Sequence, residues 1–266
     1  MNLSCPVCNE QLNNNGHSFV CVNRHTFDIA KEGYVNFLLT SKSGSQIGDN
    51  RTMALSRRDF LSKGYYLPLA QGIKAEFDNI KSSITCAADI CCGEGYYTEI
   101  VSEGFEGEFL GFDISKEMIR LAAKRKTDVL FAVANMKKLP LRDSSVDFAM
   151  HLFAPFCESE FSRILSGDGV LVSVRPGRRH LFEIKQIVYD TPYENDEEIP
   201  EYERLILTQQ IRICASVTVN SNEDLQSLFS MTPYYYRTSE KDRKKLYDAD
   251  SLSVTLDFVV DFFKKK

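Results

Sequence analysis

The feature that most constrains the fold is a regular alternation of short apolar runs with longer amphipathic segments after Thr85. The segments between the runs are long enough to form helices with one apolar face. Alternation of strands and helices predicts an α/β fold with a mainly parallel, doubly wound sheet. The strand-length apolar runs cover residues 86–91, 108–113, 128–134, 146–153 and 169–174.

Helical and β-rich segments flank this alternating region. Apolar residues recur at helical spacing over residues 53–80, interrupted by Gly64 and Pro68, and this pattern predicts two helices. Near the C-terminus, residues 205–219 and 252–262 are β-rich and are separated by a helix-like stretch. We therefore expect an antiparallel hairpin that closes the sheet.

Composition indicates a globular protein able to bury a core. Hydrophobic residues make up 43% and charged residues 26% of 266 residues. No apolar stretch is long enough to span a bilayer, and the chain opens with a cysteine-rich segment where a signal peptide would stand. The cysteines beyond this segment lie mostly in apolar runs and are interpreted as reduced core residues, which predicts a cytoplasmic protein with no membrane partner. They are Cys86, Cys91, Cys92, Cys157 and Cys214.

The charge of the chain is unevenly distributed. The net charge is −5, so the chain lacks the overall positive field of a non-specific nucleic-acid binder. Residues 190–203, however, contain seven acids and no Lys or Arg. The acidity is therefore local, and a neutral or basic surface can exist elsewhere.

Four residues near the N-terminus have the types and the spacing of zinc ligands. They follow the pattern Cys5-x2-Cys8-x12-Cys21-x3-His25. Zn²⁺ prefers four such ligands in a tetrahedron, and a complete Cys3His set leaves no open position for catalysis. Paired thiols at this spacing in an intracellular chain indicate a structural metal. His17 is interpreted as a solvated residue at the tip of the hairpin between the two pairs.

A glycine loop follows the first strand of the alternating region, in the order Asp89-x3-Gly93-Glu94-Gly95. Glycines let the backbone approach a ligand closely, and the following helix N-terminus supplies oriented N–H groups. The second strand ends in Asp113, which can accept hydrogen bonds from both ribose hydroxyls of an adenosine. The loop and this acid together predict a cofactor that contains adenosine.

The acids around this loop distinguish between adenosine cofactors. Dinucleotide-binding folds use Gly-x-Gly-x-x-Gly to cradle a pyrophosphate. Asp89 and Glu94 would repel phosphates, but they suit S-adenosylmethionine, which has no phosphate and carries an ammonium and a sulfonium. The loop therefore favours a methyltransferase over a dehydrogenase.

Taken together, these motifs resemble the RlmA family of bacterial 23S rRNA (guanine-N1)-methyltransferases over nearly the whole chain. The glycine loop alone is generic to class I methyltransferases, whereas the zinc-ligand set followed by Ala-Lys-Glu-Gly-Tyr-Val-Asn at residues 30–36 is far more specific. The stretches that carry the resemblance are residues 5–8, 21–25, 27–36, 93–98, 112–116, 122–125, 176–181 and 228–233.

The resemblance implies a class I, Rossmann-like S-adenosylmethionine-dependent methyltransferase with a small N-terminal zinc-binding β-hairpin module. It implies methyl transfer to N1 of a specific guanine in a domain II hairpin of 23S rRNA, by a homodimer. The expected parts are a zinc-binding RNA-recognition module at residues 1–38 and a methyltransferase domain at 85–266. Residues 39–84 between them hold two helices and a polar Ser/Gly linker at 41–50.

The resemblance also implies the roles of individual residues. Structural Zn²⁺ is expected on Cys5, Cys8, Cys21 and His25. The expected S-adenosylmethionine contacts are Tyr66, Gly93, Glu94 and His180, with Asp113 at the ribose, beside Asp89 and Gly95 of the loop itself.

One residue departs from the family pattern. Cys91 stands where the family usually has the first glycine of the loop, and that glycine permits close approach of the methionine part of the cofactor. A Cβ at this strained position is expected to cost about 1 kcal/mol or more and to weaken binding without abolishing it.

The exit of the fourth strand, residues 151–156, occupies the place where class I enzymes usually contact the target base. Phe153 or Phe156 could stack on a guanine drawn out of its hairpin, although both are equally compatible with a core role. His151 is interpreted as a surface histidine, and Asp147 as a residue that fixes a backbone turn. No catalytic base is assigned.

Five arginines are candidate phosphate contacts, with Arg24 placed on the zinc knuckle. Two other functions remain open. A small-molecule methyltransferase would keep the glycine loop without needing a zinc knuckle. A non-catalytic zinc/RNA-binding protein would keep the knuckle and lose cofactor affinity, as Cys91 could allow. The arginines are Arg24, Arg57, Arg58, Arg178 and Arg179.

Overall fold

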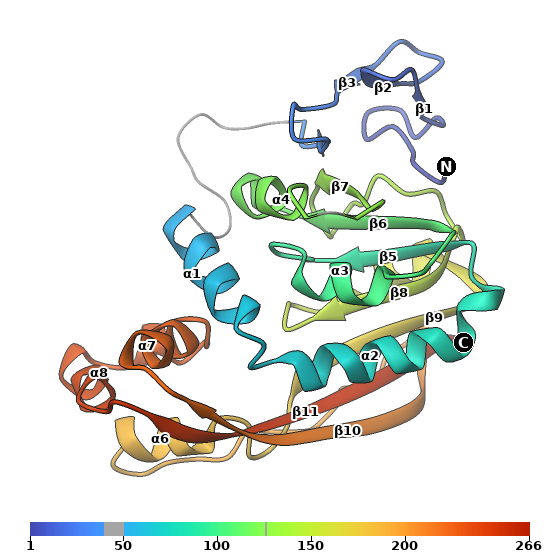
Figure 1. The fold of residues 1–266 in the computed structure, drawn as a ribbon. Helices are drawn as coiled ribbons and strands as arrows, with labels where there is room; N and C mark the ends of the chain where they lie inside the picture. Colours follow the sequence, from blue (N-terminus) through green and yellow to red (C-terminus); the bar gives the residue numbers. More distant parts are fainter. Residues whose placement is uncertain (40–50, 126) are drawn as a thin grey trace.

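The computed structural model describes residues 1–39, 51–125 and 127–266, so the linker expected at 41–50 lies outside the described residues. Its centre is an eight-stranded sheet of order β10-β11-β9-β8-β5-β6-β7-β4 (Figure 1). The strands are β4 (Val35–Asn36), β5 (Cys86–Ile90), β6 (Glu108–Asp113), β7 (Leu130–Val133), β8 (Val146–Leu152), β9 (Leu165–Pro176), β10 (Leu205–Val219) and β11 (Leu252–Lys265).

Strand directions agree with the sequence-based prediction. The five strands β5 to β9 pair in parallel, with β5 in the middle between β6 and β8. The last two strands form the expected antiparallel hairpin, in which β11 pairs antiparallel with both β9 and β10. Because the strand order reverses between β5 and β8, a crevice is expected beyond the carboxyl ends of these two strands.

Helices cover the sheet and begin at recognisable signals. Ser115, Ser221 and Ser239 each cap a helix by accepting a hydrogen bond from a backbone N–H in its first turn. Both helices expected over residues 53–80 are present, and Pro68 lies in the first turn of the second. The helices are α1 (Arg51–Ser62), α2 (Leu67–Ile80), α3 (Tyr96–Ser102), α4 (Lys116–Ala122), α5 (Glu158–Ile164), α6 (Phe182–Val188), α7 (Asn222–Ser230) and α8 (Glu240–Tyr247), with 3-10 turns η1 (Lys81–Ser83) and η2 (Tyr235–Arg237).

The two faces of the sheet bury two main apolar clusters. Phe148 and Met150 of β8 pack in the larger cluster, which includes residues of α2, α3 and α7. Cys86, Ala88 and Ile90 of β5 face the opposite way, into a cluster that includes α5 and the N-terminal segment. This alternation along a strand is the period-two pattern of a sheet buried on both sides.

The N-terminal segment forms a small sheet of its own and is also attached to the large one. Strands β1 (Asn13–Asn14), β2 (Ser18–Val20) and β3 (Thr26–Asp28) make a three-stranded antiparallel sheet. The chain then adds β4 to the edge of the large sheet, parallel to β7. At its start, Leu3 bridges to Leu141. The cysteine-rich segment is thus anchored to the large sheet at its end through β4, and at its start by the Leu3–Leu141 bridge.

The cysteines outside the zinc-ligand set differ in their exposure. Cys86 and Cys92 are buried as predicted, but Cys214 is exposed on β10, because alternate residues of that edge strand face solvent. Among the described residues, no helix is long and apolar enough to cross a membrane.

Candidate cofactor cleft and metal centre

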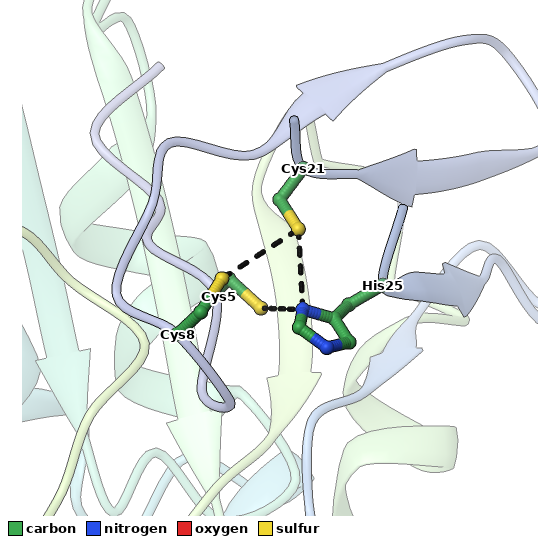
Figure 2. Close-up of side chains that lie close together, drawn as sticks. All are labelled: Cys5, Cys8, Cys21 and His25. Atoms are coloured by element: carbon green, nitrogen blue, oxygen red, sulfur yellow. Dashed lines mark hydrogen bonds between the residues drawn. The ribbon is translucent and has the colours of Figure 1, made fainter. Parts of the chain in front are cut away.

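The four predicted zinc ligands lie together, with Cys5 and Cys8 on the loop before β1 and Cys21 and His25 on the loop between β2 and β3 (Figure 2). Their ligand atoms all lie within 4.8 Å of one another. Cys5 Sγ is 3.6 Å and Cys21 Sγ 3.4 Å from His25 Nδ1, and the sulfurs of Cys8 and Cys21 are 3.7 Å apart. His17 lies exposed, away from the cluster, as expected.

These distances fit a tetrahedral zinc ion. Zn–S bonds of about 2.3 Å and Zn–N bonds of about 2.0 Å put the corners of a tetrahedron ~3.8 Å apart for two sulfurs and ~3.5 Å for sulfur and nitrogen. The geometry also assigns Nδ1 of His25 as the ligand atom. A closed set of three sulfurs and one nitrogen leaves no position for a substrate, so the centre is structural.

Backbone hydrogen bonds fold the two ligand loops. The Asn9 N–H donates to Cys5 O in the first turn, and the Arg24 N–H donates to Cys21 O in the second. Asn9 and Arg24 have positive φ values of 62° and 63°. Each ligand loop therefore contains one left-handed residue, which turns the chain so that both members of a pair face the same point.

The cofactor residues line a cleft of about 790 Å³ at the carboxyl ends of β5, β6, β8 and β9. This is the crevice expected where the strand order reverses. The predicted residues that line it are Tyr66, Asp89, Gly93, Glu94, Asp113 and His180.

The glycine loop is held open by Asp113. One of its carboxylate oxygens accepts a hydrogen bond from the Gly93 N–H at 3.0 Å, and the other accepts one from the Ser115 N–H at 2.8 Å. Gly93 has a φ of 57°, and an added Cβ would meet no heavy atom within 4 Å. The loop therefore presents bare backbone to the cleft, as a closely bound cofactor requires.

Asp89 is fully enclosed beneath this loop. It accepts a hydrogen bond of 2.5 Å from the Thr98 hydroxyl. Burial raises its pKa to about 7, since the Thr98 hydrogen bond offsets only part of the cost of desolvation. A carboxyl in this condition ionises readily when a cation such as an ammonium group arrives.

Glu94 and Gly95 were both predicted to contact the cofactor, and the structure gives each of them a further role. Glu94 is 1% exposed and forms an ion pair with Arg125, so its charge is already compensated inside the protein. Its Oε1 is buried with no hydrogen-bond partner among the described residues and can accept from a ligand. Gly95 is not among the lining residues: it begins α3 with a φ of 84°, and a Cβ there would press against Ala122. Packing of α3 against α4 therefore requires this glycine.

Tyr66 and His180 form a hydrogen-bonded pair within the cleft. The Asp257 N–H donates to His180 Nδ1 at 3.3 Å, so the ring proton resides on Nε2, which lies 3.4 Å from the Tyr66 hydroxyl. Burial lowers the pKa of His180 to about 4 and raises that of Tyr66. With Nε2–H donating, the Tyr66 O–H is left to donate to an anionic group such as a carboxylate.

Cys91 adopts the strained conformation that its position implied. Its φ is 64°, which glycine adopts easily and cysteine does not. Its sulfur contacts Met136 Sδ at 3.5 Å, and the residue lines the cleft. The departure from the glycine that the resemblance implies is therefore accommodated at the cost of backbone strain.

At the exit of β8, the structure corrects the prediction for His151 and distinguishes Phe153 from Phe156. His151 is not a surface histidine: it is 1% exposed, because β8 lies in the middle of the sheet. Phe156 packs against Phe161 and stacks on Tyr202 at 4.5 Å, so it is half-buried, although it also lines the cleft. Phe153 is 44% exposed within the cleft. Sequence periodicity could not separate these two phenylalanines.

Asp147 has the structural role predicted for it. Its carboxylate accepts hydrogen bonds from the Thr85 backbone and hydroxyl and from Ser166, which ties the start of β5 to β9. Of the candidate phosphate contacts, Arg24, Arg178 and Arg179 are exposed, whereas Arg57 lines the cofactor cleft. The arginines are thus spread over several surfaces.

Comparisons with known proteins agree with both halves of the molecule. A family model for the N-terminal zinc ribbon of RlmA matches residues 3–45, and a model of a methyltransferase domain matches residues 87–166. YxjB of Bacillus subtilis (strain 168) is 29% identical over 271 residues, covering 95% of this chain and 93% of that protein. Its name gives 23S rRNA (guanine-N1)-methyltransferase as a proposed activity.

Two further relatives are more similar over a shorter length. The 23S rRNA (guanine(748)-N1)-methyltransferase of Streptomyces fradiae is 35% identical over 186 residues, covering 68% of this chain and 66% of that protein. A protein of Micromonospora griseorubida, named for the same general activity, is 31% identical over 202 residues and covers 68% of each chain.

The fold, the cleft and the metal cluster define a class I S-adenosylmethionine-dependent methyltransferase with an N-terminal zinc ribbon. Its cofactor is S-adenosylmethionine, and its ribbon holds structural Zn²⁺. Within that class, the chain belongs to the RlmA family.

Proposed function

We propose that this protein transfers the methyl group of S-adenosylmethionine to N1 of a specific guanine in a domain II hairpin of 23S rRNA. One observation carries the proposal: a closed Cys3His cluster and a methyltransferase cleft occur in the same structure, and β4 attaches the zinc-binding segment to the sheet that forms the cleft. The names of its relatives support the substrate. A small-molecule methyltransferase would have no need of the ribbon.

The site residues divide between two tasks. Cys5, Cys8, Cys21 and His25 hold the zinc ion and thereby shape the N-terminal part of an RNA-binding surface. At the cofactor, Asp113 binds the ribose while Gly93 offers backbone. Around the methionine end, Asp89 and Glu94 face the cationic part and the Tyr66–His180 pair binds the carboxylate.

Catalysis in this arrangement is mainly positional. When bound, S-adenosylmethionine supplies an electrophilic methyl group on a good leaving group. The protein holds the guanine so that N1 lies in line with that methyl group, which accounts for most of the rate enhancement. The cleft keeps both reactants in a defined orientation, and it can accept a base only after the base has left its stack.

The division of labour along the chain follows from this mechanism. Residues 1–38 recognise RNA, and residues 39–84 connect the two parts and contribute Tyr66 to the cofactor site. Residues 85–266 supply the other cofactor contacts and transfer the methyl group. We further infer that the protein works as a homodimer, with two ribbons flanking one RNA-binding cleft.

Reverse transcription of 23S rRNA from cells with and without the gene tests the proposal, because N1 methylation blocks Watson–Crick pairing and stops the polymerase. We expect one stop at a domain II guanine that disappears with the gene and returns with a plasmid copy. Purified protein should restore 1-methylguanosine to unmethylated 23S rRNA in vitro. An unchanged stop pattern, together with no product in vitro, would rule out the proposed function.

A further inference from the structure

We propose that Phe153 and Arg175 form the subsite that holds the target guanine, with Phe153 against the base and Arg175 on its O6 atom. This guanine subsite rests on the proposed function and deepens it. It selects Phe153 from the two phenylalanines that the sequence offered as stacking residues, and it adds Arg175, to which the sequence gave no role.

The two residues are neighbours at the carboxyl ends of adjacent strands. Leu152 pairs with Val174 in the parallel register of β8 and β9, and the Phe153 N–H continues the ladder by donating to Val174 O at 3.1 Å. Arg175 is the next residue of β9, and both side chains line the cleft that holds the cofactor residues. The subsite therefore lies beside the end of β8, next to the glycine loop that follows β5.

Phe153 is held in an unfavourable state by its surroundings. It has a φ of 55°, uncommon for a bulky side chain, and 44% of its surface is exposed. Its ring lies 6.5 Å from the ring of Tyr97 and 5.6 Å from that of Phe258, so one side is supported while the rest faces the cleft. Strain combined with an exposed aromatic surface in a cleft is typical of a ligand-binding residue. A flat base that covers the exposed surface would stack on it.

One nitrogen of the Arg175 guanidinium lacks a hydrogen-bond partner within the described part of the chain. Its Nε donates to Asp261 at 2.8 Å, and Asp261 is 2% exposed and also accepts from Gln210 at 2.7 Å. The guanidinium is thus fixed by a buried carboxylate. Its Nη1 is buried and has no hydrogen-bond partner among the residues that the structure describes. A buried donor without an acceptor costs free energy, and a ligand oxygen bound at Nη1 would remove that cost.

Guanine presents a suitable oxygen next to the reacting atom. O6 is bonded to the carbon beside N1, so it takes up negative charge when the N1–H proton leaves to water. The N1 electron pair then forms the bond to the methyl carbon as the carbon–sulfur bond breaks and its electrons remain on sulfur. A fixed cation at O6 stabilises the charge that develops before transfer, in the way that an oxyanion hole does.

The nearest alternative residue does not fit this role. His151 lies two residues before Phe153, but its Nε2 is 3.1 Å from Pro155 O and must carry a proton to bind it. Burial also lowers its pKa to about 4, so at neutral pH it is an uncharged residue beneath the subsite. Arg175 therefore supplies the charged hydrogen-bond donor in this part of the cleft, where its ion pair with Asp261 fixes the guanidinium and offsets part of its charge.

The test is single-turnover methylation of 23S rRNA by the full-length protein across a pH series, with Arg175→Gln, Arg175→Lys, Phe153→Leu and Phe153→Tyr. We expect Arg175→Gln to lose about 10²–10³-fold in rate. Its rate should rise more steeply with pH than that of the wild type, because the N1 proton must leave without the cation. Arg175→Lys, which keeps the charge and the Asp261 partner, should recover part of the rate. Phe153→Leu should lose about 10-fold, consistent with a lost stacking contact, and Phe153→Tyr should retain activity.

Matched measurements separate this role from a structural one. Affinity for S-adenosylmethionine, measured by calorimetry, should stay within about twofold in each variant, as should the rate of Arg142→Ala, an exposed arginine outside the cleft. A pH-independent loss in Arg175→Gln, or a rate within threefold of wild type, would overturn the subsite. If the wild type itself leaves rRNA unmethylated, the proposed function fails. NMR titration with GMP and AMP then decides the subsite alone: it requires that GMP bind more tightly and that Arg175→Gln remove the difference.

Discussion

At the scale of single residues, the cleft contains strained and desolvated groups. A bound cofactor can offset the free-energy cost of this strain and desolvation. Cys91 and Phe153 have positive φ values just after β5 and β8, and Asp89 is buried near the end of β5. Features of this kind gather where binding requires a fixed geometry. Two of them lead to direct predictions.

Replacing Cys91 by glycine should relieve strain without opening a large cavity. We expect Cys91→Gly to raise the free energy of unfolding by about 1 kcal/mol and to tighten S-adenosylmethionine binding severalfold, since a left-handed cysteine costs about 1–3 kcal/mol and glycine loses only part of this through chain entropy. Denaturant unfolding and calorimetry measure both effects. Cys91→Ala keeps the Cβ and should show neither gain. Equal behaviour of the two variants would contradict the strain argument.

The raised pKa of Asp89, about 7, predicts two opposite pH dependences. The folded, cofactor-free protein keeps a proton that the unfolded chain releases near pH 4, so this group makes stability fall as pH rises from about 4 to 7 and then level off. Affinity for the cationic cofactor should instead rise through pH 7 as the carboxylate ionises. Asp89→Asn should flatten both curves, as measured by denaturation and calorimetry between pH 5 and 8. Unchanged slopes in the variant would assign the titration to another group.

At the scale of elements, the zinc ribbon is part of the main structure through its two ends. Beyond the β4 pairing, the Ser4 N–H donates to Pro140 O at 2.9 Å, and Arg120 of α4 forms an ion pair with Glu32 at 2.9 Å. Leu12 and Phe19 of the ribbon share an apolar cluster with β5. The ribbon is therefore held in a fixed orientation to the cleft, which a flexible tether would not provide.

Zinc removal should consequently affect RNA binding far more than cofactor binding. We expect chelation, or Cys21→Ser, to abolish 23S rRNA binding and to lower the thermal midpoint, because the metal organises loops that reach the shared core. The dissociation constant for S-adenosylmethionine should change by less than about threefold, since none of the four ligands lines the cleft. His17→Ala, at an exposed hairpin position, should keep its zinc and its RNA affinity. Retention of RNA binding by the chelated protein would exclude the ribbon from recognition.

At the scale of the whole molecule, the acidic segment 190–203 determines how much positive charge is available. It runs beside the cleft, where Asn195 and Ile199 contribute to the lining. Its acids also pair with basic residues: Glu194 lies 3.3 Å from Arg179, and Glu197 lies 2.9 Å from Arg212. The surface around the cleft mouth is therefore less positive than its arginine content implies.

This pairing predicts unequal effects of two arginines on rRNA binding. Arg178 lies 3.7 Å from Glu194, whereas Arg24 on the ribbon has no ion pair among the described residues. We expect Arg24→Ala to weaken binding and to reduce the salt slope by about one, and Arg178→Ala to reduce it by clearly less. Filter binding between low and physiological salt measures the slopes. Lys244→Ala, on α8, should leave them unchanged, and an equal or larger effect of Arg178→Ala would reverse the assignment.

Much of this architecture is local information and could be predicted from the sequence. The strand and helix alternation, the ligand spacing and the glycine loop depend on local periodicity and residue type. The closing hairpin was predicted from two β-rich runs, although its pairing joins β10 and β11 across α7 and α8. The strained position of Cys91 also followed from its place in the loop. These features were confirmed because residue type and local periodicity largely determine them.

Tertiary structure decided what depends on residues far apart in the chain. Three features depend on segments that only folding brings together. They are the burial of His151, the ion pair of Glu94 with Arg125 and the Tyr66–His180 hydrogen bond. The same is true of the anchored ribbon. Sequence by itself determined which chemistry this protein carries, because ligand types and loop geometry are local. The structure decided which side chains face the cleft and which are neutralised, because burial and charge pairing depend on the surroundings in space.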